Sequence, residues 1–257
     1  MRSPERLTLS AVPGIPLVSA GDDLGAIIIA AMENAGLAPR DGDIVVVAQK
    51  VVSKAQGRCV DLATVVPSAR AEELAVAVGK DPRLVEVILA ESVRVVRQQP
   101  RVLIVEHRLG YVTANAGVDC SNVAPAATGE MVLLLPADPD AFAAGLREEM
   151  EKHFGKSIGV VVSDSFGRAW RRGTVGVALG CAGIPALNDL RGQPDLFGRA
   201  LEVTETALAD EIASAASLLM GQAGEAQPVV LVSGFAAAER HHPARALIRP
   251  AGEDLFR

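Results

Sequence analysis

A dense group of chemically different side chains lies in the stretch VVSDSFGRAWRRG, residues 161–173. The acid Asp164 and the hydroxyl of Ser165 come directly after an apolar run, and the sequence's single tryptophan, Trp170, follows them. A carboxylate at the end of a buried strand is well placed to hold a divalent cation, and guanidinium groups bind phosphate or carboxylate through paired N–H donors. The stretch therefore indicates metal and anion binding, and the alternative is a capped turn with surface arginines. The candidate anion contacts are Arg168, Arg171 and Arg172.

Two lysines lie close together in a second polar segment, residues 45–58, where an apolar run leads into Gln49 and Lys50, and Lys54 follows. In a helix, Lys50 and Lys54 would share one face. Like charges at this spacing destabilise a helix slightly unless an anion lies between them. The pair therefore indicates either a phosphate-binding site or a solvated basic face. The sequence contains no GxxxxGK[ST], which excludes a P-loop as the phosphate-binding device.

A third polar segment, residues 112–123, surrounds Asp119, Ser121 and Asn122 with small residues, and its Gly117 allows a tight bend. Aspartate, serine and asparagine are common in ordinary turns. Their oxygens are also the ligands that Mg²⁺ and Mn²⁺ prefer in proteins. The segment is therefore compatible with a simple turn and with a metal site.

A fourth segment, residues 219–227, places Gly221 and Gly224 between a helical pattern and an apolar run. Glycines at these positions would let backbone N–H groups approach an anion or a base. The alternative is the end of a helix followed by a connecting loop. In both interpretations the segment leads directly into the strand expected over residues 229–232.

Short β-branched apolar runs flank these polar segments and are typical of buried strands. Helical patterns separate the runs. A helix is expected over residues 22–34, capped by Asp22 or Asp23, and a longer helix is expected over residues 204–220, capped by Thr204. This alternation predicts an α/β or α+β chain, in which ligand groups collect at strand ends. The expected strands are 44–47, 102–105, 132–135, 158–162 and 229–232, and the other expected helices are 71–78, 84–90 and 139–152.

The composition favours a protein with an aliphatic core and no nucleic-acid partner. Of the 257 residues 49% are hydrophobic but only 3% are aromatic, and the net charge of −6 argues against a protein that coats nucleic acid. The three cysteines form no CxxC pair, which favours reduced thiols over disulfides or a zinc ribbon. No signal peptide and no apolar run of bilayer-spanning length is visible. We therefore expect a cytoplasmic protein without a membrane partner.

Several motifs together resemble the coenzyme F420-0:L-glutamate ligase family, the γ-glutamyl ligases of deazaflavin cofactor synthesis. The motifs are VVSKAQG, ANAGVDCSN, SDSFGRAWRRG, DLRGQPDLFGR and VTETALADEIASAASLLMG, in this order. The resemblance covers residues 7–234. It implies a mixed α+β fold of two lobes, with mixed sheets and flanking helices. It also implies a single γ-glutamyl ligase domain over residues 1–257, formed by two interleaved lobes, without the C-terminal nitroreductase-like domain of some relatives.

The resemblance further implies an activity. Family members use GTP to join L-glutamate to the deazaflavin F420-0 through an acyl phosphate, and the addition of further γ-linked glutamates is a possible extension. The resemblance implies two divalent cations, Mg²⁺ or Mn²⁺, with K⁺ as a possible additional ion. It also implies a homodimer.

Individual positions can be carried over from the family. The resemblance implies that Asp119 and Asp164 hold the first metal, that Ser165 and Gln222 hold the second, and that Asn122 contacts the nucleotide. Further GTP contacts are expected from the N-terminal segment, from the helix after the first buried run and from the loop before the last one. These contacts are Ile15, Pro16, Leu17, Val18, Gln49, Lys50, Lys54, Met220, Gly221, Gln222, Ala223, Gly224, Glu225, Ala226 and Gln227.

Two positions depart from the family pattern, which often has Glu in place of Gln56 and Pro in place of Ala169. Neither position is an expected ligand. Two other functions stay open from the residues: a non-catalytic nucleotide- or deazaflavin-binding protein, and an amide ligase of the same fold that uses another acid. Glutamate-dependent GDP formation would separate the first of these from the ligase.

Overall fold

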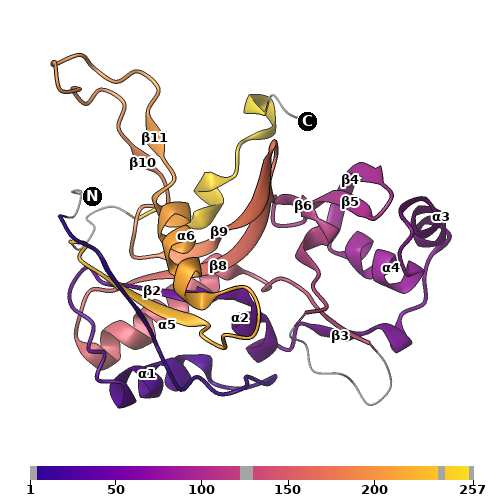
Figure 1. The fold of residues 1–257 in the computed structure, drawn as a ribbon, viewed down its shortest axis with the longest axis horizontal. Helices are drawn as coiled ribbons and strands as arrows, with labels where there is room; N and C mark the ends of the chain where they lie inside the picture. Colours follow the sequence, from indigo (N-terminus) through magenta and orange to yellow (C-terminus); the bar gives the residue numbers. More distant parts are fainter. Residues whose placement is uncertain (1–4, 122–129, 237–240, 255–257) are drawn as a thin grey trace.

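A five-stranded mixed sheet lies at the centre of the computed structural model, which describes residues 5–121, 130–236 and 241–254 (Figure 1). The strand order is β1-β12-β2-β8-β9. Strands β2 and β8 run parallel, whereas the other neighbouring pairs are antiparallel. The strands are β1 (Thr8–Ala11), β2 (Ile44–Ala48), β8 (Gly159–Arg168), β9 (Arg171–Ala182) and β12 (Val229–Ser233).

Both faces of this sheet are covered by helices. Successive side chains of a strand point to opposite faces, so Val45 and Val47 pack with α1 and α5, whereas Ile44 and Val46 pack with α6. Burial on both faces explains why the strands are continuous β-branched runs instead of alternating apolar and polar residues. The helices of this larger lobe are α1 (Leu24–Asn34), α2 (Gln49–Ala55), α5 (Pro139–Phe154) and α6 (Leu208–Met220).

Glycines in β9 let two of these helices approach the sheet closely. A Cβ atom at Gly176 would lie 2.3 Å from the carbonyl oxygen of Ala213 in α6. A Cβ atom at Gly180 would lie 2.2 Å from the carbonyl oxygen of Pro139, at the start of α5. Any larger residue would therefore push a helix backbone away from the sheet.

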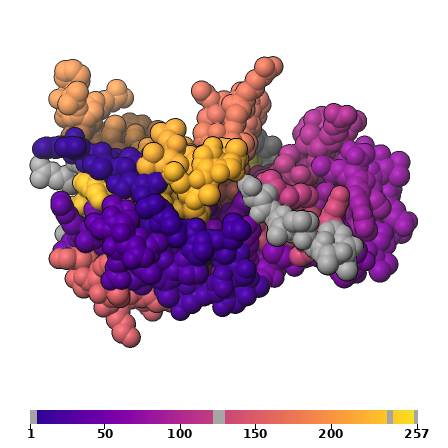
Figure 2. Space-filling view, turned by 60° about the horizontal axis from the view of Figure 1, so that its bottom comes forward, coloured from indigo at the N-terminus to yellow at the C-terminus, as the bar shows by residue number. Residues whose placement is uncertain are grey.

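A smaller lobe is inserted between α2 and α5 and has its own hydrophobic core, which includes Leu74, Ile88, Leu103 and Val132. It stands to one side of the larger lobe in Figure 2 (magenta). Its elements are β3 (Cys59–Asp61), the 3-10 turn η1 (Leu62–Thr64), α3 (Ala69–Val78), α4 (Pro82–Ala90), β4 (Ser92–Gln99), β5 (Val102–His107), β6 (Val112–Ala114), the 3-10 turn η2 (Asn115–Gly117) and β7 (Met131–Leu133).

A long hairpin arm extends from the larger lobe in Figure 1 (orange). The short strands β10 (Asn188–Asp189) and β11 (Glu205–Thr206) pair at its base. At its tip Leu196 and Phe197 are 98% and 95% exposed. The expected homodimer stays a prediction. Two further 3-10 turns, η3 (Ala244–Leu247) and η4 (Ala251–Glu253), follow near the C-terminus.

The predicted α+β class is confirmed, since helices and several mixed sheets are both present. Each expected apolar run contains or overlaps a strand, and the side chain of Asp23 caps α1 by accepting a hydrogen bond from the Ala26 N–H at 3.0 Å. Other expected helices coincide with α3, α4 and α5 within a few residues.

Two local predictions are wrong. The expected helix start at Thr204 is replaced by β11, and α6 begins only at Leu208, because Glu205 and Thr206 pair with β10. Asp164 and Ser165 do not follow a strand that ends at Val162; they lie inside β8, which continues to Arg168 because β9 pairs with it along this length. No helix in the described ranges is long and apolar enough to cross a membrane.

Candidate active site

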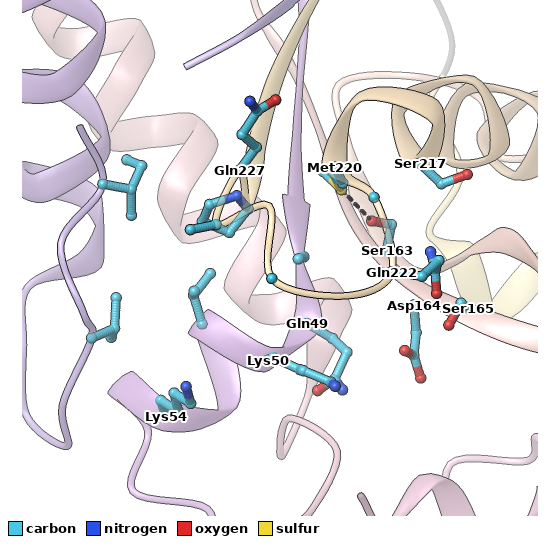
Figure 3. Close-up of a pocket in the computed structure, with 18 of the residues that line it drawn as sticks. Gln49, Lys50, Lys54, Ser163, Asp164, Ser165, Ser217, Met220, Gln222 and Gln227 are labelled. Carbon is cyan, nitrogen blue, oxygen red and sulfur yellow. Dashed lines mark hydrogen bonds between the residues drawn. The ribbon is translucent and has the colours of Figure 1, made fainter. Parts of the chain in front are cut away.

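A cavity of about 340 Å³ opens at the carboxyl end of β2, beside the middle of β8, where the parallel pairing of the two strands ends at Ser163 (Figure 3). This is the position at which open α/β sheets bind their ligands. The volume suits a small molecule. The cavity is lined by Ile15, Pro16, Leu17, Val18, Ala48, Gln49, Lys50, Val51, Lys54, Ser163, Asp164, Ser165, Ser217, Met220, Gly221, Gln222, Ala223, Gly224, Ala226, Gln227 and Pro228.

One wall of the cavity is formed by α2, which begins directly after β2. Lys50 therefore lies in the first turn of the helix, and Lys54 lies one turn later on the same side. Gln49 is buried, and its side-chain oxygen accepts a hydrogen bond from the Ser53 hydroxyl at 3.0 Å. In Figure 3 Lys50 extends toward Asp164, whereas Lys54 lies at the other end of the helix.

A second wall is the loop that joins α6 to β12. Gly221 ends α6 with φ 69°, a backbone conformation that favours glycine. Glu225 then bends back and accepts a hydrogen bond from the Ala223 N–H at 2.8 Å. The loop therefore presents its backbone and small side chains to the cavity. The Glu225 carboxylate forms its hydrogen bond within the loop and does not line the cavity.

Asp164 is half-buried on the third wall, which β8 provides. Burial raises the pKa of Asp164 to about 6; hydrogen bonds from the Ser165 N–H and Gln49 and the charge of Lys50 lower it in part, and the nearby Asp119 raises it further. Two carboxylates and one ammonium thus share a small region. A buried carboxylate close to a second one favours the binding of a cation.

Asp119 comes to this region from the smaller lobe, across a long interval of sequence. Its Oδ2 lies 2.8 Å from the Nζ of Lys50, and its Oδ1 accepts a hydrogen bond from the Ser121 N–H at 2.7 Å. Burial tends to raise the pKa of Asp119, but hydrogen bonds from Lys50 and Ser121 outweigh this effect and lower it. Asp119 is therefore ionised. It does not line the cavity itself, but it forms an ion pair with Lys50, which does.

Most of the residues that the family resemblance implies are brought together around this cavity. Three are placed differently: Asp119 and Glu225 lie beside the cavity without lining it, and Asn122 lies outside the described residues. The metal and nucleotide roles of all these residues stay predictions, because their proximity alone does not identify a ligand.

The three arginines and Trp170 lie away from the cavity, at the tip of the β8–β9 hairpin. Trp170 has φ 60° in the tight turn and is 81% exposed. Arg168 donates a hydrogen bond to the carbonyl oxygen of Arg172 at 3.2 Å. Since a strand rises about 3.3 Å per residue, Arg168 is roughly 13 Å from Asp164 along β8. The predicted anion contacts of Arg168, Arg171 and Arg172 are therefore not part of the cavity wall.

The sequence interpretation missed two serines. Ser163 precedes Asp164 in β8, is buried, and directs its hydroxyl to the sulfur of Met220 at 3.7 Å. Ser217 lies in the last turn of α6 and also lines the cavity. Ser163 could have been identified as a cavity residue from its position in the motif SDS, next to Asp164. No sequence feature identifies Ser217, because it is one of several serines on a long helix.

Comparison with known proteins assigns the chain to a family. Residues 14–234 match the family of F420-0:Gamma-glutamyl ligases. The chain belongs to this family. The matched residues include the whole lining of the cavity, from Ile15 to Pro228.

Several relatives are named "Coenzyme F420:L-glutamate ligase". The chain is 42% identical to the protein of Methanothermobacter thermautotrophicus, over 98% of this chain and 99% of that protein. It is 45% identical to the protein of Methanopyrus kandleri over 98% of each chain. It is 46% identical to the protein of Methanocaldococcus jannaschii over 84% of this chain and 85% of that protein.

The donor atoms in and directly beside the cavity suit a hard divalent cation. The carboxylates of Asp119 and Asp164, the hydroxyl of Ser165 and the amide of Gln222 all offer oxygen, the ligand that Mg²⁺ and Mn²⁺ prefer. Within the described ranges, no three histidine, cysteine or acidic side chains gather closely enough to form a metal cluster of their own. The residues therefore fit an ion that takes part of its coordination from a ligand or from water.

Proposed function

We propose that this chain joins L-glutamate to the deazaflavin F420-0, as the names of its family and relatives suggest. We further propose that it uses GTP and two divalent cations for this reaction. The proposal is carried by one arrangement: two lysines on α2 face an ionisable carboxylate across a single cavity. A nucleotide triphosphate and its metal ions need both kinds of charge at short range.

Within this proposal each wall of the cavity has a role. The ammonium groups of Lys50 and Lys54 neutralise phosphate oxygens, and backbone N–H groups of the loop around Gly224 contact the nucleotide. Asp119 and Asp164 would hold one cation, and Ser165 and Gln222 the other. When bound, such cations neutralise the charge that develops on the transferred phosphoryl group.

The proposed reaction has two steps. An oxygen of the acceptor carboxylate attacks the γ-phosphorus of GTP; the bond to the bridging oxygen breaks, GDP leaves, and an acyl phosphate forms. The amine of L-glutamate then attacks the acyl carbon, the carbon–oxygen bond breaks, and inorganic phosphate leaves while the amine loses its proton to water. Lys50 and Lys54 contribute by reducing the repulsion between the anionic reactants.

The test is product analysis of the wild-type chain incubated with F420-0, GTP, Mn²⁺ and L-glutamate. Mass spectrometry should detect the acceptor extended by a glutamyl residue, with one GDP formed for each amide. Omission of L-glutamate should abolish the extended product. Further glutamyl additions would appear as a series of heavier products.

Two results would contradict the proposal. Nucleotide and F420-0 binding without glutamate-dependent GDP formation would indicate a non-catalytic binding protein. GDP formation that requires another acid in place of F420-0 would indicate an amide ligase with a different acceptor.

A further inference from the structure

We infer that Lys50 occupies the cation position at Asp119 until a divalent cation binds there, and that this binding releases Lys50 to the nucleotide phosphates. The inference rests on the proposed function, since it takes Asp119 as a ligand of the cation. It assigns Lys50 a role in coupling cation binding to nucleotide binding. Lys54, on the same helix, does not have this role.

The hydrogen bonds of the Lys50 ammonium are directed to one short segment of the smaller lobe. Its Nζ lies 2.8 Å from Oδ2 of Asp119, 2.6 Å from the hydroxyl oxygen of Ser121 and 3.4 Å from the Ser121 carbonyl oxygen. An ammonium group has three N–H donors. All three therefore have acceptors in this segment, and Lys50 has no donor left for a phosphate while these contacts persist.

The two oxygens of Asp119 differ in their availability to a cation. Oδ1 accepts the backbone N–H of Ser121 at 2.7 Å, a contact that fixes the orientation of the carboxylate. Oδ2 is directed at Lys50. A divalent cation that binds Asp119 from the cavity side therefore needs Oδ2, the atom that Lys50 contacts.

Lys50 and the cation exclude each other at this atom. A Mg²⁺ or Mn²⁺ ion binds a carboxylate oxygen at about 2.1 Å, so it would lie within about 5 Å of the present ammonium position. Their charges repel strongly at such a distance in a partly buried site. Asp164 lies near both groups and attracts whichever cation is present.

A released Lys50 has a defined direction to move. Its side chain is attached to the first turn of α2, on the face that continues to Lys54 and lines the cavity. No described residue forms a salt bridge with Lys54. Rotation of the flexible Lys50 side chain toward Lys54 would therefore create a pair of ammonium groups at the place proposed for the phosphates.

This exchange couples the binding of the divalent cation to the binding of the nucleotide. Without the divalent cation, a nucleotide must compete with Asp119 for Lys50; with the cation bound, Lys50 is available. Linkage requires the reverse effect as well, so the nucleotide favours cation binding by the same factor. Lys54 takes part in nucleotide binding but not in this exchange.

The experiment compares Lys50→Met with Lys54→Met in the full chain, because both variants remove one positive charge from the same face of α2. Mn²⁺ binding without nucleotide is measured by the electron paramagnetic resonance signal of free Mn²⁺. We expect Lys50→Met to bind Mn²⁺ at least about five-fold more tightly than Lys54→Met, because the competitor at Oδ2 is absent.

The same variants are then titrated with GDP by calorimetry, with and without Mn²⁺. We expect Lys54→Met to weaken GDP binding by a similar factor in both conditions. In Lys50→Met the loss should be several-fold larger when Mn²⁺ is present, because only the Mn²⁺-bound wild type has Lys50 available. Thermal unfolding confirms that both variants are folded.

Equal Mn²⁺ affinity of the two variants, including no detectable binding by either, would overturn the inference. So would a loss of GDP affinity in Lys50→Met that is the same with and without Mn²⁺. Either result leaves the proposed reaction intact, because wild-type product formation is measured separately. Failure of product formation would instead overturn the proposed function.

Discussion

The buried position of Asp164 makes the stability of the cation-free fold depend on pH. Burial raises the pKa of its carboxyl to about 6, from an ordinary value of 3.8, so the ionised form is disfavoured in the folded chain. The contribution of the protonated Asp164 carboxyl to the free energy of unfolding is therefore fully present below pH 3.8. This contribution is lost as the pH rises through 6. At pH 8 the ionised carboxylate costs about 1–3 kcal/mol, where the lower value allows for its solvent contact.

We therefore predict that Asp164→Asn separates stability from function. At pH 8 without divalent cations, the free energy of unfolding in urea should equal or exceed that of the wild type. Product formation should fall below detection, and Mn²⁺ should raise the Tm of the wild type but not that of the variant. Wild-type turnover in the variant would reject the metal role of Asp164.

The individual residues of the site were largely predictable, but their pairing was not. Lys50, Lys54, Asp164 and the glycine loop were indicated by residue type next to apolar runs. The ion pair between Lys50 and Asp119 was not, because a sequence contains no signal for which of many distant carboxylates meets a given lysine. The arginines show the opposite case: they are close to Asp164 in the sequence, but the extended strand β8 separates them from the cavity, and their predicted anion contacts stay a prediction.

Strand β9 depends on glycine where α6 crosses it. A Cβ atom at Gly176 would lie 2.3 Å from the Ala213 carbonyl oxygen, a contact that a backbone atom cannot relieve by rotating. We predict that Gly176→Ala lowers the free energy of unfolding by about 1–3 kcal/mol, measured by urea denaturation.

Gly167→Ala is the matched control, since Gly167 lies in the same hairpin and a Cβ atom there would meet nothing within 4 Å. Its effect should stay within about 0.5 kcal/mol. If both variants were equally destabilised, strand propensity and not the contact with α6 would explain the result.

The elements themselves were predictable where local pattern and tertiary environment agree. The buried runs of β2 and β12 and the capped start of α1 are such cases. Residues 204–206 were assigned to a helix, because a local pattern does not contain the partner strand β10 that holds them extended. The continuation of β8 past Asp164 was missed for the same reason, since it depends on pairing with β9.

A partly buried ionic cluster joins the segment after α2 to the smaller lobe. Glu91 follows α4 with its side chain 12% exposed, and its Oε2 accepts hydrogen bonds from Arg58 at 2.7 Å and Arg108 at 3.0 Å. The Nε2 of the buried His107 lies 3.4 Å away, while its Nδ1 accepts the Leu109 N–H. Burial would raise the pKa of Glu91, but His107, Arg108 and Arg58 together lower it to about 2.

We predict that Glu91→Gln destabilises the molecule by about 3 kcal/mol at pH 7, because it leaves Arg58 and His107 without their carboxylate. The contribution of Glu91 is complete above its ordinary pKa of 4.5 and is lost as the pH falls toward 2. Urea denaturation should therefore show a smaller difference from the wild type at pH 3 than at pH 7. Glu73→Gln, which removes an exposed pair with Arg70, should change stability by less than about 1 kcal/mol at either pH.

The insertion of the smaller lobe also affects how the chain can reach its folded state. Ile44 pairs with Gly159 in the central sheet, so this parallel pairing must close a very long stretch of chain. The two ends of the insertion lie side by side, where the Leu134 N–H donates to the Arg58 carbonyl oxygen at 2.9 Å. Once the smaller lobe has folded, only α2, α5 and their connecting turns separate β2 from β8, and the entropy lost on closure is correspondingly reduced.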